Sequence, residues 1–341
     1  MALTANSKPV ENILLIRLKA IGDVIFTLPA VGALREHFPA AKITFLTSKE
    51  NADLLRGFPH VNEVIALDRA ALRSGHPVKM SAEFFGLLRR LRAGKFSLVV
   101  DFQGFGETAW LARITGAPRR WGSVYGAGRR WAYTRGLARD EKIHPADWNL
   151  ELLDRCGVAG HAVRNEFALP ADALAAARKH LSENSLDPAR PTLVIQPFTS
   201  SAQKNWPLEN FLAVARHWRS VGAQVIFSGG PADHSRLEPA RAERFCVVAG
   251  PPLLVSAGLA QLAALTLGGD TGLGHLAVAQ GRRVVMLMRH NQPGASVPFQ
   301  HPDWAIVPGG PACNIREITV ARVLEETGRV LSAHLSNQTQ G

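Results

Sequence analysis

The sequence predicts an α/β protein with two parallel sheets, because short apolar runs alternate with helical patterns along the whole chain. Helices that connect parallel strands cover both faces of a sheet, so each sheet should lie between two layers of helices. The 341 residues are enough for two domains of roughly 150 residues each. We therefore expect two α/β domains that share one plan.

The first half begins with the most informative stretch, Asn12–Leu34. An apolar run at 13–18 stops at Lys19, and a helical pattern starts immediately after Gly22. This order predicts a buried strand, a tight glycine turn and a helix whose first residue is Asp23. Open parallel sheets bind ligands at the carboxyl ends of their strands, which is where this places the carboxylate. At this point Asp23 is either a helix cap or a catalyst.

The remaining elements follow in alternation, with a break between the halves around residues 170–191. In the first half, further strands are expected at Lys42–Thr47, Glu63–Leu67 and Ser97–Phe102, and helices at about Asp23–His37, Asn51–Gly57, Ser81–Ala93 and Thr108–Thr115. In the second half, strands are expected at Thr192–Gln196, Gln224–Ser228, Cys246–Val248, Ala264–Gly268 and Arg283–Met288, and helices at Leu208–Ser220, His234–Glu243, Leu253–Leu262, Gly274–Gln280 and Val320–His334. The break holds a helical stretch, Ala171–Leu181, and then a polar segment bounded by proline. We expect domains at 1–168 and 191–341, joined by a linker region at 169–190.

The positive charge of the chain is concentrated in its first half. The net charge is +11, and residues 1–165 carry 24 lysines and arginines against 15 aspartates and glutamates. The densest run, Arg113–Lys142, contains eight cations and four interleaved tryptophans and tyrosines. Such a run attracts anions, namely nucleic acid, an acidic membrane face or a phosphorylated substrate, and the alternative is a solvated loop.

The rest of the composition is that of a cytosolic protein. The amino-terminal residues are polar, and no apolar run approaches the roughly 18 residues that a membrane span needs. The three cysteines are far apart and form no CxxC pair, so neither a disulfide framework nor a structural zinc site is expected.

Three strand-to-helix turns of the second half carry groups that suit a nucleotide. The segment Leu267–His275 opens a helix whose free amides form an anion site; there Asp270 would bind sugar hydroxyls or cap the helix, and His275 would donate to a phosphate or lie satisfied in the core. The loop 197–207 offers the hydroxyls of Thr199, Ser200 and Ser201 and the cation of Lys204, which suit a diphosphate. In the third turn, Gly229 and Gly230 permit close backbone approach and Asp233 is able to reach a ribose.

One motif points elsewhere. Gly104–Ala109 fits the relaxed dinucleotide fingerprint GxGxxA, but it follows a late strand, so a nicotinamide enzyme is not favoured.

Four stretches, taken in order, resemble glycosyltransferase family 9, the ADP-heptose:lipopolysaccharide heptosyltransferases. They are ILLIRLKAIGDVIFTLPAVGALREHFP (13–39), FSLVVDFQGFGETAWLARITGAPRRWG (96–122), TLVIQPFTSSAQKNWPLENFLAVARHW (192–218) and LAQLAALTLGGDTGLGHLAVAQGRRVV (259–285). The resemblance implies a GT-B fold, with two facing Rossmann-like domains and an interdomain cleft. The N-terminal domain would bind the acceptor and the C-terminal domain the nucleotide-sugar, and the final helix, 320–334, would be able to cross back to the first domain.

The resemblance also implies roles for particular residues. Asp23 would be the general base, and Asp270 would bind the sugar. The diphosphate contacts would be Thr199, Ser200, Lys204 and the backbone of Thr271, Gly272 and Leu273, with His275, Gly229, Gly230 and Asp233 as further donor contacts. The acceptor contacts would be Lys19, Gln103, Arg119, Arg120, Arg129 and Arg130. No metal and no other cofactor is expected.

The resemblance predicts inverting, metal-independent transfer of heptose from ADP-heptose to an anionic lipopolysaccharide inner-core acceptor of the Kdo-lipid A type. Such an enzyme would work in the cytoplasm, in transient contact with the inner face of the inner membrane, and would bind no nucleic acid. The chain departs from the family at Met286–Gln292, where a Phe-Gly-Pro-Thr segment is usual, and at Gly269, where asparagine is frequent. Three alternatives remain: a transferase with another nucleotide-sugar or a protein acceptor, a nucleotide-sugar epimerase, and a non-catalytic anion-binding protein.

Overall fold

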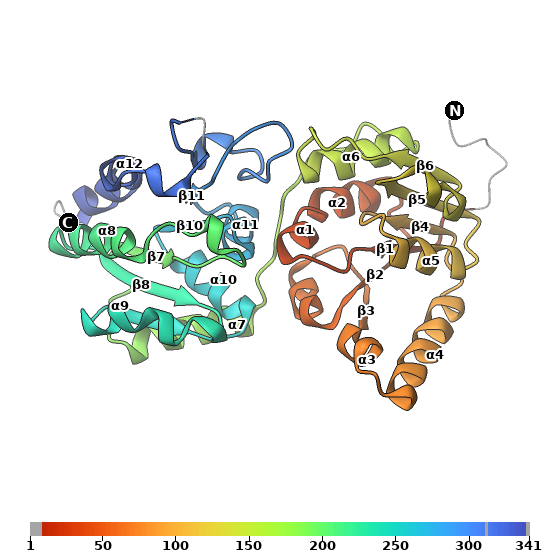
Figure 1. The fold of residues 1–341 in the computed structure, drawn as a ribbon, viewed down its shortest axis with the longest axis horizontal. Helices are drawn as coiled ribbons and strands as arrows, with labels where there is room; N and C mark the ends of the chain where they lie inside the picture. The colour runs from red at the N-terminus through yellow and green to blue at the C-terminus, as the bar shows by residue number, and fades with distance from the viewer. Residues whose placement is uncertain (1–8, 311–312, 339–341) are drawn as a thin grey trace. The chain divides into compact units, whose positions relative to one another are not determined.

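The computed structural model describes residues 9–310 and 313–338, which form two α/β units, Met1–Glu166 and Phe167–Gly341. Each unit contains a six-stranded sheet, and all strand pairs in both sheets are parallel (Figure 1). The predicted α/β class and the two parallel sheets are therefore confirmed.

The first unit matches the predicted strands and adds two more at one edge of the sheet. Its strands are β1 (Asn12–Ile16), β2 (Lys42–Ser48), β3 (Glu63–Leu67), β4 (Leu98–Asp101), β5 (Arg119–Val124) and β6 (Arg135–Ala138). Its helices are α1 (Ile21–Ile25), α2 (Leu28–His37), α3 (Arg69–Arg73), α4 (Pro77–Ala93), α5 (Gly106–Ile114) and α6 (Pro145–Arg155), with 3₁₀ turns η1 (Lys49–Asn51), η2 (Asp53–Gly57) and η3 (Ala127–Ala132). The basic run 113–142 thus contains β5, η3 and β6, so two parts of it pair in the sheet and the run is not one continuous loop.

The second unit matches the prediction closely. Its strands are β7 (Thr192–Gln196), β8 (Gln224–Gly229), β9 (Cys246–Ala249), β10 (Leu265–Gly269), β11 (Val284–Leu287) and β12 (Ala305–Ile306). Its helices are α7 (Ala171–Glu183), α8 (Leu208–Ser220), α9 (Glu238–Ala242), α10 (Leu253–Leu262), α11 (Gly272–Ala279) and α12 (Val320–Gln338), with 3₁₀ turns η4 (Ala202–Lys204), η5 (Pro231–Asp233), η6 (Ser235–Leu237), η7 (Pro302–Trp304) and η8 (Ile315–Glu317). The stretch expected as a linker region contains α7, which packs against α10. The last helix, α12, packs against α8, β10 and β11.

Alternating apolar residues place a core on each face of the second sheet. Leu193 and Ile195 of β7 face a core to which α8 and α12 contribute. Val194, between them, faces the smaller core formed with α7 and α10. In the first unit, α4 and α5 contribute to the core on one face of the sheet, and α2 packs against α6. Parallel sheets require this double covering, because both of their faces are buried.

The two sheets share one strand order. The first sheet has the order β3-β2-β1-β4-β5-β6. The second, read from its other edge, has the order β9-β8-β7-β10-β11-β12, so β7 corresponds to β1 and β10 corresponds to β4. In this arrangement the direction of chain progression reverses between β1 and β4, and again between β7 and β10. Loops diverge at such a switch point, and doubly wound sheets bind their ligands there.

Candidate active site

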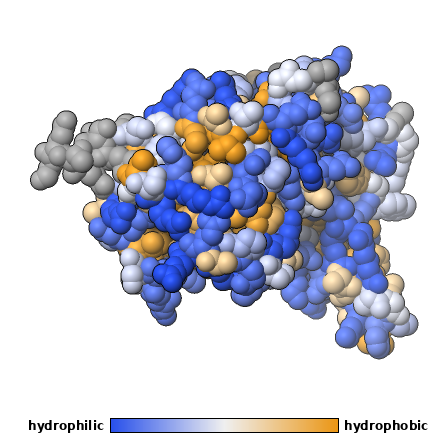
Figure 2. Space-filling view, turned by 60° about the vertical axis from the view of Figure 1, so that its left-hand side comes forward, coloured by the Kyte–Doolittle hydropathy of each residue, from blue (hydrophilic) through white to orange (hydrophobic). Residues whose placement is uncertain are grey.

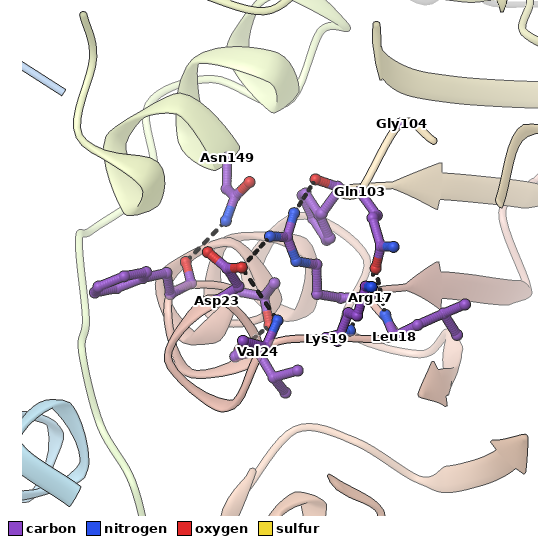
Figure 3. Close-up of polar contacts among 12 residues, drawn as sticks. Arg17, Leu18, Lys19, Asp23, Val24, Gln103, Gly104 and Asn149 are labelled. Carbon is purple, nitrogen blue, oxygen red and sulfur yellow. Dashed lines mark hydrogen bonds and ion pairs between the residues drawn. The ribbon is translucent and has the colours of Figure 1, made fainter. Parts of the chain in front are cut away.

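Asp23 lies at the switch point of the first sheet, at the carboxyl end of β1. It is the third residue of α1 and not, as predicted, the first, because the helix already begins at Ile21. Its Oδ2 accepts a hydrogen bond of 3.1 Å from the backbone N–H of Ala20 and lies 2.6 Å from Nη2 of Arg17 (Figure 3). Asp23 therefore does cap its helix, by reaching back to the preceding turn.

The cap and the ion pair use only one of the two carboxylate oxygens. Within residues 9–310 and 313–338, no hydrogen bond reaches Oδ1 of Asp23, and the side chain is 36% exposed. Arg17, in contrast, is 12% exposed, and its Nη1 donates to the carbonyl of Phe102 at 2.8 Å. The carboxylate is thus fixed through Oδ2, while Oδ1 remains available to accept a proton.

Gln103 holds the loop between β1 and α1. Its Oε1 accepts hydrogen bonds from the backbone N–H groups of Leu18, at 2.8 Å, and Lys19, at 3.3 Å (Figure 3). The side chain of Gln103 is completely buried, whereas that of Lys19 is exposed. Of these two expected acceptor contacts, Gln103 is therefore part of the scaffold that positions the loop, and Lys19 is accessible.

A buried carboxylate supports this loop from β4. Oδ1 of Asp101 accepts from the backbone N–H groups of Gln103 and Gly104, and Oδ2 accepts from the hydroxyl of Tyr133 at 2.6 Å. Burial raises the pKa of Asp101, and the hydrogen bonds from Tyr133 and the backbone oppose that rise. Burial beside Asp101 likewise raises the pKa of Tyr133. These contacts connect η3 and β6, through β4, to the loop that precedes Asp23.

The four expected acceptor arginines lie in different places. Arg119 and Arg120 begin β5, at the amino end of the strand, which is the edge of the sheet opposite Asp23. The guanidinium of Arg120 donates to the carbonyls of Ala132 and Ala117, so it braces the strand. Arg129 and Arg130 follow the carboxyl end of β5, in η3.

Arg129 belongs to the same edge of the sheet as Asp23. Its Nη1 donates to the carbonyl of Gly104 at 3.2 Å. Arg130 is exposed, and its Nε donates to the carbonyl of Gly136 at 3.3 Å. The structure therefore separates the four expected arginines into two pairs. Of these, only Arg129 and Arg130 lie beyond the carboxyl end of β5, at the edge of the sheet that also holds Asp23.

Two residues at the carboxyl edge were not among the expected acceptor contacts, Arg17 and Arg139. Arg139 follows β6, interacts electrostatically with Arg17, Asp23 and Tyr125, and lies over the ring of Trp148 at 5.3 Å. Burial lowers the pKa of its guanidinium, which still remains charged at neutral pH. The only sequence signal for Arg17 was a cation that interrupts the apolar run 13–18.

The second unit places Asp270 at its own switch point, directly after β10. Oδ2 of Asp270 lies 2.6 Å from Nζ of Lys204 and accepts from the hydroxyl of Ser296 at 3.1 Å. Oδ1 lies 2.9 Å from Nε2 of His275. The expected residues Lys204, Asp270 and His275 are therefore in contact, and Ser296 adds a partner that the sequence did not suggest.

These contacts keep Asp270 ionised. Burial alone would raise its pKa, but the hydrogen bonds and charges of His275 and Lys204 hold the pKa well below the ordinary value. His275 is 3% exposed, so it orients Asp270 and does not extend into solvent. Lys204 is 44% exposed, so it is the cation of the group that solvent reaches.

Backbone N–H groups complete the site at the start of α11. Thr271 is the N-cap residue, and its Oγ1 accepts from the N–H of Gly274 while donating to Oε1 of Gln196 at 2.6 Å. The N–H groups of Gly272 and Leu273 belong to the first turn, where a helix has no internal acceptors for them. This end of the helix therefore attracts anions.

The loop after β7 lies against β10 because Gly269 has no side chain. A Cβ at this position would stand 2.6 Å from Cγ2 of Thr199. The hydroxyl of Thr199 donates to the carbonyl of Ser201 at 2.8 Å, and its N–H donates to Oδ1 of Asn205 at 2.8 Å. Ser200 is exposed. Thr199, Ser200 and Lys204 are thereby brought to the same edge as Asp270.

The third predicted turn carries an acid that is already paired. Oδ2 of Asp233 accepts from the N–H of Gly230, and Oδ1 lies 2.8 Å from Nη1 of Arg236. The guanidinium of Arg236 stacks 3.6 Å from the ring centroid of Phe198, on the loop after β7. A Cβ at Gly229 would stand 2.9 Å from Cβ of Asp233. Asp233 therefore closes its own turn and joins it to the neighbouring loop.

Two features are absent from the part of the chain that the structure describes, a cluster of metal ligands and a membrane-spanning helix. Neither residues 9–310 nor 313–338 contain three histidine, cysteine, aspartate or glutamate side chains grouped to hold a metal ion. In the same ranges, every helix is too short or too polar to cross a bilayer.

The chain is similar to known proteins over most of its length. Residues 84–310 match the model of glycosyltransferase family 9 (heptosyltransferase). The lipopolysaccharide core heptosyltransferase OpsX of Haemophilus influenzae is 24% identical over 306 residues, which cover 86% of this chain and 83% of that protein. Lipopolysaccharide heptosyltransferase 1 of Pseudomonas aeruginosa is 27% identical over 293 residues, 83% of this chain and 80% of that one.

A solved structure of similar fold is the ADP-heptose lipopolysaccharide heptosyltransferase II of Escherichia coli. It has a TM-score of 0.76 at 21% identity, over 96% of this chain and 99% of that one. The predicted GT-B fold is confirmed by this likeness together with the two parallel sheets. Since the family model matches more than half of the chain, at residues 84–310, the chain belongs to glycosyltransferase family 9 and is a glycosyltransferase.

Proposed function

We propose that the enzyme transfers heptose from ADP-heptose to an anionic inner-core acceptor of lipopolysaccharide, of the Kdo-lipid A type, with inversion and without a metal ion. One observation carries the proposal: each sheet presents, at its switch point, one half of what a glycosyl transfer needs. The first has the carboxylate of Asp23, one oxygen of which has no hydrogen-bond partner among the described residues. The second has the Lys204–Asp270–His275 group beside a helix N-terminus. The relatives named above support heptose as the sugar.

In the proposed reaction, the acceptor hydroxyl oxygen attacks the anomeric carbon of the heptose. The hydroxyl proton passes to Oδ1 of Asp23, and the bond between the anomeric carbon and the diphosphate oxygen breaks. Because Arg17 and Ala20 fix Oδ2, the lone pairs of Oδ1 are held in one orientation. The carboxylate is a weak base, which suffices when the proton moves late in the attack.

ADP leaves with the bonding electrons and carries an additional negative charge. Lys204 and the N–H groups of Gly272 and Leu273 would stabilise that charge, together with the dipole of α11. Asp270, held ionised, would accept hydrogen bonds from hydroxyls of the heptose. No metal is needed if these groups neutralise the diphosphate.

The acceptor would be bound by cations at the carboxyl edge of the first sheet. Arg17, Arg129 and Arg139 belong to this edge, whereas Arg119 and Arg120 begin β5 at the opposite edge. Phosphate and carboxylate groups of the inner core suit arginine, which forms two parallel hydrogen bonds with such anions. Transient contact with the cytoplasmic face of the inner membrane would bring the enzyme to this lipid-linked substrate.

The proposal is tested by calorimetric titration with ADP-, UDP- and GDP-sugars, followed by transfer assays with the sugar that binds best. We expect ADP-heptose to bind most tightly, and a deacylated inner-core acceptor to gain one heptose of inverted anomeric configuration. A preference for UDP-sugars would contradict the heptose assignment. Turnover of the donor without dependence on an acceptor would favour an epimerase instead.

A further inference from the structure

We propose that the amino half of α4 is a membrane-contacting element that lies against the surface of an anionic bilayer. The inference rests on the proposed function, because it supplies the place at which the enzyme meets a lipid-linked acceptor. Three observations support it: α4 exposes several apolar side chains, cations surround them, and α4 begins at the same edge of the sheet as Asp23.

One face of α4 carries a stripe of apolar residues, and only part of this stripe is buried in the core. Met80, Phe84, Leu87 and Leu91 recur at helical spacing on one face of this 17-residue helix. Leu87 and Leu91 are buried at 2% and 1% exposure, whereas Met80 and Phe84 are 37% and 45% exposed. The carboxyl half of the helix therefore packs on the sheet, and the amino half projects past it. Figure 1 shows α3 and α4 meeting at the tip of this projection.

Two further apolar side chains of α4 are exposed beside the stripe, and the ring centroid of one of them, Phe85, lies 5.6 Å from that of Phe84. Val78 and Phe85, seven residues apart, are 77% and 64% exposed. Of the eleven large apolar side chains that are exposed in the described part of the chain, four belong to α4. Side chains of this kind are usually scattered singly over a protein surface, and a group of them indicates a surface that binds something. In Figure 2, pale and orange side chains lie among blue ones on the lowest part of the molecule, which is this projection.

The charge around these side chains selects an anionic partner. Arg73 of α3 and Lys79, Arg89 and Arg92 of α4 are exposed, and in the described ranges none of the four has an ion pair. The single acid of α4, Glu83, lies 3.7 Å from Arg90. A helix that combines exposed phenylalanines with unpaired cations is suited to lie in a headgroup layer, its rings in the acyl boundary and its cations among acidic lipids.

The position of the element agrees with this partner. α3 follows the carboxyl end of β3, so the start of α4 lies at the same edge of the first sheet as Asp23. An ion pair of 3.2 Å between Arg69 and Glu107 fastens α3 to the start of α5, which also leaves this edge. A helix of 17 residues is about 26 Å long, so its exposed half reaches roughly a dozen ångström beyond the part packed on the sheet. A bilayer in contact with α4 would therefore lie on the side from which a lipid-linked acceptor approaches Asp23.

The test is co-sedimentation of the full-length enzyme with vesicles of phosphatidylethanolamine and phosphatidylglycerol, and with vesicles of phosphatidylcholine alone. We expect binding to the anionic vesicles only, and weaker binding at high salt. The double variant Phe84→Ser/Phe85→Ser should bind about tenfold more weakly, because both rings lose their place in the acyl boundary. A second variant, Val78→Ser, should also weaken binding, because Val78 is 77% exposed on α4. Its matched control is Val221→Ser, since Val221 is exposed on the other unit, and this control should not change binding.

The other possible results of these experiments also distinguish between the proposals. Absence of binding to anionic vesicles, or equal binding by wild type and the double variant, would overturn the proposal. A change in molar mass by light scattering with unaltered vesicle binding would assign the surface to a second copy of the chain. Unchanged thermal unfolding and unchanged transfer to a deacylated, water-soluble acceptor would show that the variant is folded and active. Failure of the wild type to transfer heptose would contradict the proposed function and leave the vesicle result standing.

Discussion

The guanidinium of Arg17 lies 2.6 Å from Oδ2 of Asp23, the same oxygen that accepts the N–H of Ala20. The ion pair and the helix cap therefore converge on one atom, and within the described residues neither uses Oδ1. This division would let a single residue serve both as a structural cap and as the proposed base. It also predicts that disturbing either oxygen impairs turnover, but in different ways.

Replacement of Asp23 by Asn tests the base. The amide oxygen preserves the acceptor for Ala20 but takes up no proton, so we expect turnover to fall by about 10²–10⁴-fold. Affinity for the donor, which we place on the other unit, should change little. Steady-state kinetics together with donor titration give both numbers. Near-wild-type turnover would reduce Asp23 to a cap.

Arg17→Met tests the positioning of that base. The variant keeps the carboxylate but removes its guanidinium partner, so kcat should fall by about tenfold to a hundredfold through lost orientation. Arg17→Lys should recover only part of the loss, because one ammonium reproduces the fork toward Asp23 and Phe102 poorly. The control is Arg155→Met, which removes an exposed pair with Glu151, also at 2.6 Å, and should leave kcat unchanged. Equal kcat in Arg17→Met and wild type would refute the role.

The arginines of the two sheet edges should behave differently toward the acceptor. Arg129→Gln and Arg139→Gln should each raise the KM for the acceptor about tenfold, as expected for one lost charge-assisted contact, without altering donor affinity. Arg119→Glu, a charge reversal at the amino edge of β5, should leave both unchanged. The opposite pattern, in which only the Arg119 variant raises the KM for the acceptor, would indicate that the acceptor binds at the edge where β5 begins.

Asp270 should make stability depend on pH in the acidic range. Its folded pKa lies below the ordinary value of 3.8, so the unfolded chain takes up a proton first as the pH falls through that value. The contribution of Asp270 is thus complete at neutral pH and is lost progressively below about pH 4. Urea unfolding of wild type and Asp270→Asn at pH 6 and pH 3.5 should show a smaller loss of stability in the variant. Equal losses would contradict the assignment.

Tyr133→Phe should destabilise the first unit. The variant removes one hydrogen bond from the fully buried carboxyl group of Asp101, which costs about 1–3 kcal/mol. Tyr125, the other tyrosine of the chain, is 42% exposed, and Tyr125→Phe is the matched control. Denaturant unfolding followed by tryptophan fluorescence measures both. Equal free energies of unfolding for the two variants would show that the Asp101 contact is not stabilising.

The local sequence was sufficient to predict those strands and helices whose own residues mark where they begin and end. The strand at Thr192–Gln196 and the helices at Leu208–Ser220 and Leu253–Leu262 were predicted with the observed bounds, since apolar runs and proline flanks mark them. The predicted helix Asp23–His37 is divided into α1 and α2, and the second begins at Leu28 with Pro29 in its first turn. The basic strands β5 and β6 were missed because their stability derives from pairing with β4 and with each other.

The site residues differ in the same way: some are marked by local sequence, and others are recognised only from contacts in the fold. Asp23, Asp270, Lys204 and His275 stand in recognisable turns, and the structure brings the last three together. Arg17 was hidden within an apolar run, and the contact of Ser296 with Asp270 spans 26 residues that no short motif connects. Gln103 was expected to contact substrate, but its burial, which depends on packing between β1 and β4, makes it a support for the loop.

The close approach of Thr199 to Gly269 has a consequence for divergence within the family. A side chain at 269 would occupy space that Thr199 fills, because a Cβ there would stand 2.6 Å from its methyl group. The two positions are distant in the sequence, but they share one small volume beside Asp270. Homologues that carry asparagine at 269 should therefore have a smaller residue or a displaced loop at 199, so the identities of this pair should covary across the family.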